Sequence, residues 1–214
     1  MPINFIAVLD HQHLENSIFL TAFAKSLARL GDRKGLVIHG DSPYTDRLIQ
    51  TGMMREDARL RAIKDLNKRL VGLFADQGIP TIGIHGFQKG LIKMEGDTFS
   101  LEKEALDAHH ASPNLLISNL VEHNGDPKHI PLPEFTRSIS LELEHAEILL
   151  FSKNEKDEIL ISETEKKLSW DNLPTEFAES TLPEEFQNFN HPVKLATATD
   201  FANWPSLKKV TKIE

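Results

Sequence analysis

The sequence predicts an α/β fold, a three-layer sandwich in which helices cover both faces of a mostly parallel central sheet. One observation is a series of short apolar runs rich in Val, Ile and Leu, which are typical of strands buried on both faces. Another is that longer segments with apolar residues at helical spacing alternate with these runs. Because a helix that crosses between neighbouring strands makes them parallel, the alternation favours a mostly parallel sheet.

The first half of the chain has the clearest alternation. Its short apolar runs predict strands at residues 4–9, 35–39 and 80–84. Helical spacing predicts helices at 19–30 and 55–77, each followed by a glycine that is typical of a helix end. Asp41-Ser42-Pro43 supplies oxygens and a proline that are typical of a helix start. The turn Glu95-Gly96-Asp97 predicts a hairpin that joins residues 91–94 to 98–101.

The second half continues the pattern less regularly. Apolar runs predict strands at 115–120, 147–151, 193–197 and 210–213, with helices at 133–144 and, shorter, near 200–204. Residues 159–162 are expected to pair with the strand at 147–151. The segment from Glu163 to Asn190 is acidic and interrupted by prolines, so loop and short helix are expected there.

Composition narrows the class of protein. The chain has 214 residues, a net charge of -8 and no cysteine. An acidic chain is a poor partner for nucleic acid, which needs clustered Lys and Arg. Without cysteine there is no disulfide or thiolate zinc site, which favours the cytoplasm. The apolar run Phe5 to Leu9 is too short for a signal peptide or a membrane span, so no membrane association is expected.

Three segments carry a family resemblance. They are Leu36-Val37-Ile38-His39-Gly40, Asn67-Lys68-Arg69-Leu70-Val71, and the run from Gly78 to Gly86. In order and spacing they resemble the amino-acid kinase family, and within it the acetylglutamate kinase type. Weaker similarity extends to Gly90-Leu91-Ile92-Lys93, to 146–152 and to the last two expected strands.

The resemblance implies an amino-acid-kinase (carbamate-kinase-like) fold. It implies an acceptor-binding lobe at 1–131 and a reduced nucleotide-type lobe at 132–214, with a homodimer formed near a helix of the first lobe. Members transfer the γ-phosphoryl group of MgATP to a carboxylate or similar acceptor. The implied substrate-binding positions in this chain are His39, Gly40, Asp41, Ser42, Arg55, Asn67 and Lys68.

The phosphate-handling motifs depart from the family pattern. Where the family has Lys-x-Gly-Gly, this chain has Val8-Leu9-Asp10-His11, so valine replaces the catalytic lysine and Asp10 and His11 replace the nucleotide-binding glycines. Asp41 adds a second negative charge where phosphate is handled. Glu134 is the carboxylate that remains of the family's Asn-Ala-Asp motif, and 163–190 offers no second catalytic lysine.

Each candidate residue also has a purely structural interpretation. The 39–42 segment is compatible with an ordinary helix cap, and Arg55 and Glu134 with helix starts. Asn67 is compatible with a polar contact between helix and sheet, and Lys68 with a solvated face. His11, His13, His109 and His110 raise the possibility of a metal site. Without a third ligand at suitable spacing, we expect exposed loop histidines and no metal.

The sequence therefore favours a pseudo-kinase that binds a small carboxylate, such as an N-acylated amino acid, or a partner protein. No cofactor is expected unless the chain is active. A competing hypothesis is a divergent kinase that uses MgATP, with Lys153 or Lys194 replacing the missing lysines. A third is a regulatory or structural subunit.

Overall fold

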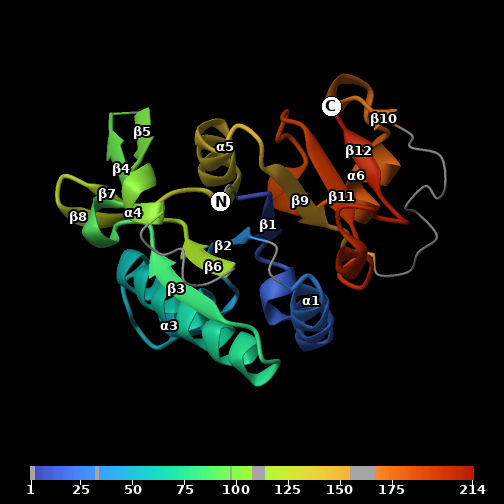
Figure 1. Cartoon of the computed structure of the whole chain (residues 1–214). Coiled ribbons are helices and arrows are strands. Elements are labelled where there is room, and N and C mark those ends of the chain that lie inside the picture. Colours follow the sequence, from blue (N-terminus) through green and yellow to red (C-terminus); the bar gives the residue numbers. More distant parts are fainter. Residues whose placement is uncertain (1–2, 32–33, 97, 108–113, 155–166) are drawn as a thin grey trace.

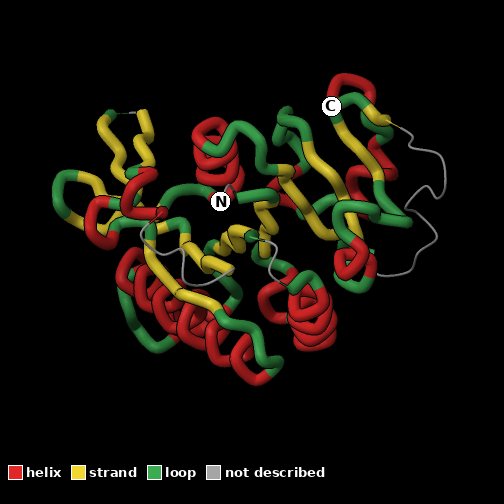
Figure 2. Tube along the Cα trace, viewed as in Figure 1, coloured by secondary structure: helices red, strands yellow, loops and turns green. Residues whose placement is uncertain are grey.

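The computed structural model describes residues 3–31, 34–96, 98–107, 114–154 and 167–214, which alternate between strands and helices (Figures 1 and 2). The first half contains β1 (Phe5–Leu9), α1 (Ser17–Arg29), β2 (Gly35–His39), α2 (Tyr44–Gln50), α3 (Arg55–Asp76), β3 (Thr81–His85), β4 (Ile92–Glu95), β5 (Thr98–Leu101) and α4 (Lys103–Asp107). The second half contains β6 (Asn114–Ser118), β7 (Leu120–His123), β8 (Asp126–His129), α5 (Leu132–Glu142), β9 (Glu147–Phe151), β10 (Lys167–Leu168), α6 (Thr175–Thr181), β11 (Val193–Ala196) and β12 (Thr211–Ile213).

The main sheet has eight strands in the order β10-β12-β11-β9-β1-β2-β6-β3. All neighbouring pairs are parallel except β11 and β12. β1 lies inside the sheet, where Phe5 is in register with Gly35 on one side and with Glu147 on the other. The mostly parallel sheet predicted from the alternation of elements is thus confirmed.

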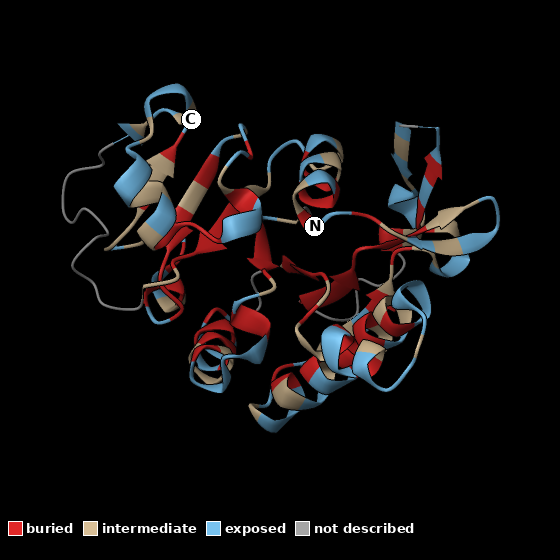
Figure 3. Cartoon of the chain, turned by 180° about the vertical axis from the view of Figure 1, so that it is seen from behind, coloured by how far each residue is buried: buried red, intermediate tan, exposed pale blue. Residues whose placement is uncertain are grey.

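Two hydrophobic cores make the sheet the middle of three layers. Side chains of β1 alternate between them, with Phe5 and Ala7 on one face and Ile6 and Val8 on the other. The first face is covered by α1 and α3. Their apolar stripes consist of Phe19, Phe23 and Leu27 in α1 and of Leu66, Leu70 and Phe74 in α3. The opposite face is covered by α5 and α6. The central strands are accordingly buried along their length (Figure 3).

A second, smaller sheet has the order β5-β4-β7-β8. It confirms the hairpin expected at 91–94 and 98–101. It also corrects the single strand expected at 115–120, because the chain leaves the main sheet at Asn119 and enters β7 of the smaller sheet. Asn119 makes this break by donating its backbone N–H to the carbonyl oxygen of His39 (3.0 Å) and its side-chain Nδ2 to that of Ile130 (2.5 Å).

The acidic segment contains short elements, as expected. Its described part holds α6, the brief strand β10, and 3-10 helices at Trp170–Asn172 (η3) and Glu184–Phe186 (η4). The helix expected near 200–204 is also a 3-10 helix, Asp200–Asn203 (η5). The strand expected at 159–162 lies outside the described residues. None of the described helices combines the length and the apolar character needed to cross a membrane.

Candidate functional site

The candidate site lies at the carboxyl ends of the central parallel strands. β1 sits between β2 and β9, so the connections after these strands diverge at their carboxyl ends, and we call the region where they diverge the crevice. Such a switch point is where open α/β sheets bind ligands. Polar residues follow the strands there: Asp10 after β1, Asp41 after β2, Asn119 after β6 and Ser152 after β9.

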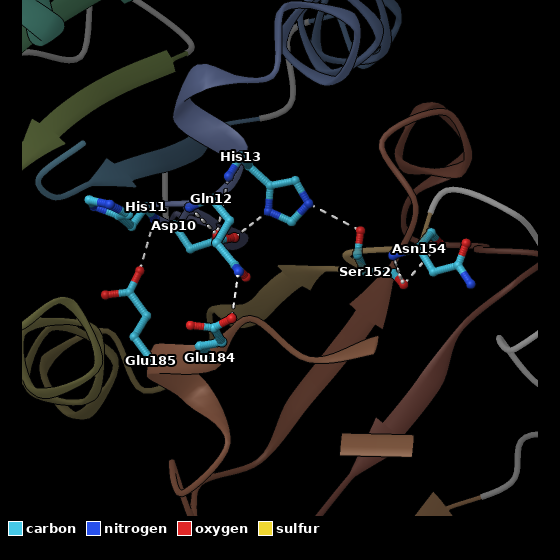
Figure 4. A network of polar contacts seen from close by, with 8 residues as sticks. All are labelled: Asp10, His11, Gln12, His13, Ser152, Asn154, Glu184 and Glu185. Atoms are coloured by element: carbon cyan, nitrogen blue, oxygen red, sulfur yellow. Dashed lines mark hydrogen bonds and ion pairs between the residues drawn. The ribbon is translucent and has the colours of Figure 1, made fainter. Parts of the chain in front are cut away.

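The turn after β1 is organised by a buried Asp10. Its Oδ1 accepts the backbone N–H groups of Gln12 (3.0 Å) and His13 (3.3 Å), and its Oδ2 pairs with Nδ1 of His13. Nε2 of His13 lies 3.1 Å from the carbonyl oxygen of Ser152 at the end of β9 (Figure 4). His13 is 4% exposed. The expectation of an exposed loop histidine is therefore wrong for His13, because its ring bridges Asp10 and β9.

Two glutamates of η4 reach the same turn from the second half of the chain. Oε1 of Glu185 accepts the backbone N–H of His11 at 2.9 Å, and Oε1 of Glu184 accepts Nε2 of Gln12 at 3.0 Å (Figure 4). Much of the Glu185 residue is exposed, but its carboxyl group is crowded by the protein at the crevice. Burial chiefly raises the pKa of Glu185 to about 7, with smaller contributions from the charges of Asp10 and Asp41 and an opposing one from the His11 N–H.

His39 and Asn67 form a buried link between α3 and β2. Nδ2 of Asn67 donates to Nε2 of His39 (3.0 Å), and Nδ1 of His39 lies 3.1 Å from the carbonyl oxygen of Gly40. Burial lowers the pKa of His39 to about 4, so the ring is neutral and Nε2 acts as the acceptor. Both side chains are thus occupied within the protein. Asn67 therefore makes the polar contact between helix and sheet that was its structural interpretation from the sequence.

Asp41 links the segment before α2 to Arg59, a residue that was not predicted from the sequence. Its Oδ1 accepts the N–H of Ser42 (2.7 Å) and the hydroxyl of Thr45, and its Oδ2 accepts Nε of Arg59 at 3.2 Å. Burial lowers the pKa of His129 to about 4, as does the charge of Arg59, whereas Asp41 opposes the shift. The three charged or titratable groups therefore lie near one another beside α3.

The remaining predicted positions are more scattered. Arg55 is exposed at the start of α3, one turn before Arg59, and Lys68 is exposed further along the same helix. Glu134 is exposed in the first turn of α5. Gly40 packs closely, since a Cβ there would lie 3.1 Å from Nδ2 of Asn119. The structure brings Asp10, His11 and Asp41 to the crevice but leaves Arg55, Lys68 and Glu134 on the surface.

The lysines considered as replacements differ in position. Lys153 follows β9 at the crevice edge, where its Nζ donates to the carbonyl oxygen of Glu179 (2.6 Å). Lys194 is near the amino ends of β11 and β9, where its Nζ pairs with Glu147 at 2.5 Å. It therefore lies at the ends of the strands opposite to the crevice. The described residues contain no cluster of three or more His, Asp or Glu side chains suited to a metal. His109 and His110 fall outside the described residues.

Sequence reasoning missed Arg59, His129 and Glu185. Arg59 had a usable signal, because it lies one helical turn after Arg55 and therefore on the same side of α3. His129 is the last residue of β8 in the unpredicted hairpin of β7 and β8. Glu185 had no local signal, since its partner is the distant His11.

Comparison with known proteins addresses the fold. No protein-family model matches the sequence, and no curated protein matches it significantly. Solved structures do match. N-acetylglutamate synthase from Neisseria gonorrhoeae, complexed with coenzyme A and N-acetyl-glutamate, is similar with a TM-score of 0.66 and 15% identity over 99% of this chain. Isopentenyl phosphate kinase from T. acidophilum is similar with a TM-score of 0.60 and 10% identity over 99% of this chain.

This chain has the amino-acid-kinase fold. Aspartate kinase from Synechocystis adds a third similar structure, with a TM-score of 0.64 and 12% identity over 98% of this chain. The chain spans 59% of the synthase chain and 40% of the aspartate kinase chain, but all of the isopentenyl phosphate kinase chain. At 10–15% identity the likeness establishes the fold alone.

Proposed function

We propose that this chain binds a small carboxylate, of the N-acylated amino acid class, in the crevice and does not transfer a phosphoryl group from ATP. The first part of the proposal rests on Arg59 and on the fold. The second rests on the turn after β1.

The observation that carries the loss of phosphoryl transfer is the occupancy of backbone amides. Phosphate sites in proteins use free backbone N–H groups of a turn or helix start. Here the N–H of His11 donates to Glu185, and those of Gln12 and His13 donate to Asp10. These three N–H groups are already hydrogen-bonded to side-chain carboxyl groups of the chain itself, so they are not available to bind a phosphate.

The acidic groups at the crevice also disfavour phosphoryl transfer. Asp10 and Asp41 bring carboxylates toward the crevice, Glu185 adds a carboxyl group whose pKa is raised to about 7, and Val8 replaces the lysine of the family pattern. Phosphoryl transfer spreads negative charge over the transferring group, and removing one stabilising donor typically costs about 10²–10³ in rate. Several such losses together make phosphoryl transfer by this crevice very slow.

The carboxylate-binding part of the proposal assigns the ligand to Arg59. Its guanidinium contacts Asp41 through Nε at 3.2 Å, which holds the planar group in place. The two terminal nitrogens then provide the paired donors that suit a carboxylate. Arg59 replaces Arg55 in this role because Arg55 is exposed at the helix start. The similar synthase structure, which is complexed with N-acetyl-glutamate, supports the class of ligand.

A divergent kinase is the second candidate, favoured by the position of Lys153. This lysine follows β9 at the crevice edge, within one residue of Ser152, whose carbonyl oxygen contacts His13. If Lys153 left its contact with Glu179, its ammonium group would supply one of the missing positive charges. This candidate requires MgATP to bind.

Thermal shift titrations with N-acetylglutamate and, separately, MgATP test both parts. A ligand that binds only the native state stabilises it by about 2.7 kcal/mol at about 100 times its Kd. We expect N-acetylglutamate to raise the melting temperature and MgATP to leave it unchanged. Arg59→Ala should abolish the shift, whereas Arg55→Ala, the matched control on the same helix, should retain it.

The outcomes separate the candidates. A shift with MgATP, together with acyl phosphate trapped as a hydroxamate, overturns the loss of phosphoryl transfer and supports the kinase. In that case Lys153→Ala should remove the product. An unchanged melting temperature with N-acetylglutamate and related N-acyl amino acids overturns the carboxylate-binding part alone.

A further inference from the structure

Within the described part of the chain, β3 forms an open edge of the main sheet. It is the last strand in the described order and pairs with β6 on one side only. The N–H of Gly86 points to β6, where it donates to the carbonyl oxygen of Ser118 (3.4 Å). Because peptide groups alternate along a strand, those of Thr81, Gly83 and His85 point away from β6. The N–H of His85 is bonded to Oε1 of Gln88 at 2.8 Å, and Thr81 and Gly83 present theirs at the open edge.

An apolar cavity lies beside this edge. Its volume is about 470 Å³, and its lining is mostly apolar: Ile82, Ile84, Phe87, Leu91 and Ala105. Ile82 and Phe87 are half-buried, so part of this apolar surface faces solvent. A cavity of this size next to free backbone groups is suited to one large apolar side chain carried by an added strand.

Lysines border the same edge although the whole chain is acidic. Lys64 and Lys68 project from α3, and Lys89 lies in the 3-10 helix Gln88–Gly90 (η2) after β3. Nζ of Lys64 lies 5.2 Å from the ring centroid of Phe87. The proximity of Lys64 and Lys68 also contributes, after burial, to lowering the pKa of His85 to about 4. These three lysines place positive charge at this edge of a chain whose net charge is -8.

We infer that the open edge of β3 is a docking site for an extended, acidic peptide segment of a partner protein, with one large apolar side chain seated in the cavity. Backbone groups of Thr81 and Gly83 would pair with the peptide, as in β-strand addition. Its carboxylates would face Lys64, Lys68 and Lys89. This role is independent of the crevice, which lies at the carboxyl ends of the central strands.

A second copy of this chain fits the edge less well. Two copies paired through β3 about a two-fold axis would bring Lys64, Lys68 and Lys89 toward their own equivalents. Like charges placed opposite each other in paired strands are destabilising. The homodimer expected from the family resemblance is therefore a competing occupant of the β3 edge, and the experiment distinguishes it from a bound peptide.

The test uses the full chain and a library of short random peptides displayed on phage. Peptides selected on the immobilised protein are synthesised with a fluorophore, and their Kd is measured by fluorescence anisotropy. We expect the selected sequences to be enriched in Asp and Glu around one large apolar residue. Binding should weaken as salt rises, because the lysines are solvent-accessible.

Variants locate the site. Lys64→Glu combined with Lys68→Glu should weaken binding at least about tenfold, because both interactions become repulsive. Lys25→Glu combined with Arg29→Glu on exposed positions of α1 makes the same change in net charge and should leave the Kd unchanged. Thr81→Pro removes an N–H that points away from β6, so it should weaken peptide binding while the main sheet persists, as monitored by circular dichroism.

Three results overturn the inference. One is a selection that yields no acidic consensus. Another is peptide binding that responds equally to the β3 and the α1 charge reversals. The third is a dimer, seen by analytical ultracentrifugation, that Thr81→Pro dissociates and that the peptides do not displace, because the edge then belongs to a second copy.

Discussion

At the scale of single residues, Glu185 couples the two halves of the chain to pH. Its carboxyl group accepts the N–H of His11, and its pKa is raised from 4.5 to about 7. The folded state therefore holds this proton more tightly than the unfolded state does. The resulting stabilisation is fully present below pH 4.5 and is lost as pH rises through about 7.

Glu185→Gln should remove this dependence while keeping an oxygen for the N–H of His11. We expect the free energy of unfolding of the variant, relative to the parent, to increase between pH 4.5 and pH 7. Burial lowers the pKa values of His39, His85 and His129 to about 4, so these three residues make the folded state more stable as pH rises. They are present in both proteins, and their effect therefore cancels in the comparison. Urea unfolding across this range measures the difference, and Glu184→Gln is the matched control. A parallel pH profile for parent and variant would contradict the prediction.

The buried hydrogen bond of Asn67 gives a second prediction about stability. Its side chain is 4% exposed and donates to His39. Asn67→Ala should destabilise the protein by about 1–3 kcal/mol, because it leaves a buried acceptor on His39 without its donor. Arg69→Ala, exposed two positions along α3, should change stability by less than about 0.5 kcal/mol. Equal effects in denaturant titrations would mean that the buried contact contributes little.

At the scale of elements, two glycines illustrate how sheet and helix differ. A Cβ on Gly35 in β2 would lie 1.9 Å from Cζ of Phe5, whose ring is 0% exposed. Gly72 in α3 has open space around it. Gly35→Ala should therefore cost about 1–3 kcal/mol through overpacking, whereas Gly72→Ala should stabilise by about 0.5–1 kcal/mol. Thermal unfolding of the two variants checks the opposite signs, and a shift of the same sign in both would refute the argument.

Elements with one dominant pattern could be predicted from the sequence. The buried strands and α3 follow directly from apolar runs and helical spacing. The hairpin of β7 and β8 was missed because Leu120 extends the apolar run of β6, although Asn119 breaks it. The signal was Asn124-Gly125, a pair typical of a tight hairpin turn, where both residues have positive φ, 54° and 89°.

The candidate site was harder to predict than the fold. Asp10, His11 and Asp41 could be placed at strand ends, because the ends of parallel strands meet at one edge. The role of His13 could not, since it depends on the carbonyl oxygen of Ser152 in β9. The same holds for Glu185. Contacts between residues far apart in sequence leave no local pattern.

At the scale of the whole molecule, one continuous sheet passes through both halves of the chain. β1 of the first half pairs directly with β9 and, through it, is connected to β11 of the second half, while β2 pairs with β1. The sheet and the contacts of Glu184 and Glu185 lead us to expect a single cooperative unfolding transition.

Both tryptophans make this expectation testable. Trp170 and Trp204 belong to the second half, and Trp204 also packs against Phe5 of β1. Their fluorescence therefore reports on the second half and its contact with β1, whereas far-ultraviolet circular dichroism reports on the entire chain. The two signals should give coincident urea midpoints. Separate midpoints would mean that the halves unfold independently despite the shared sheet.

The place of β1 also has a consequence for biosynthesis. β1, at the centre of the sheet, is synthesised long before β9, so Phe5 must wait for Glu147 before the second edge of its strand is paired. Contacts over such a sequence separation slow folding, and an unpaired apolar strand is prone to aggregation in the interval. The nascent chain therefore has a long period in which the apolar strand β1 needs protection, and a chaperone would find its target in this strand.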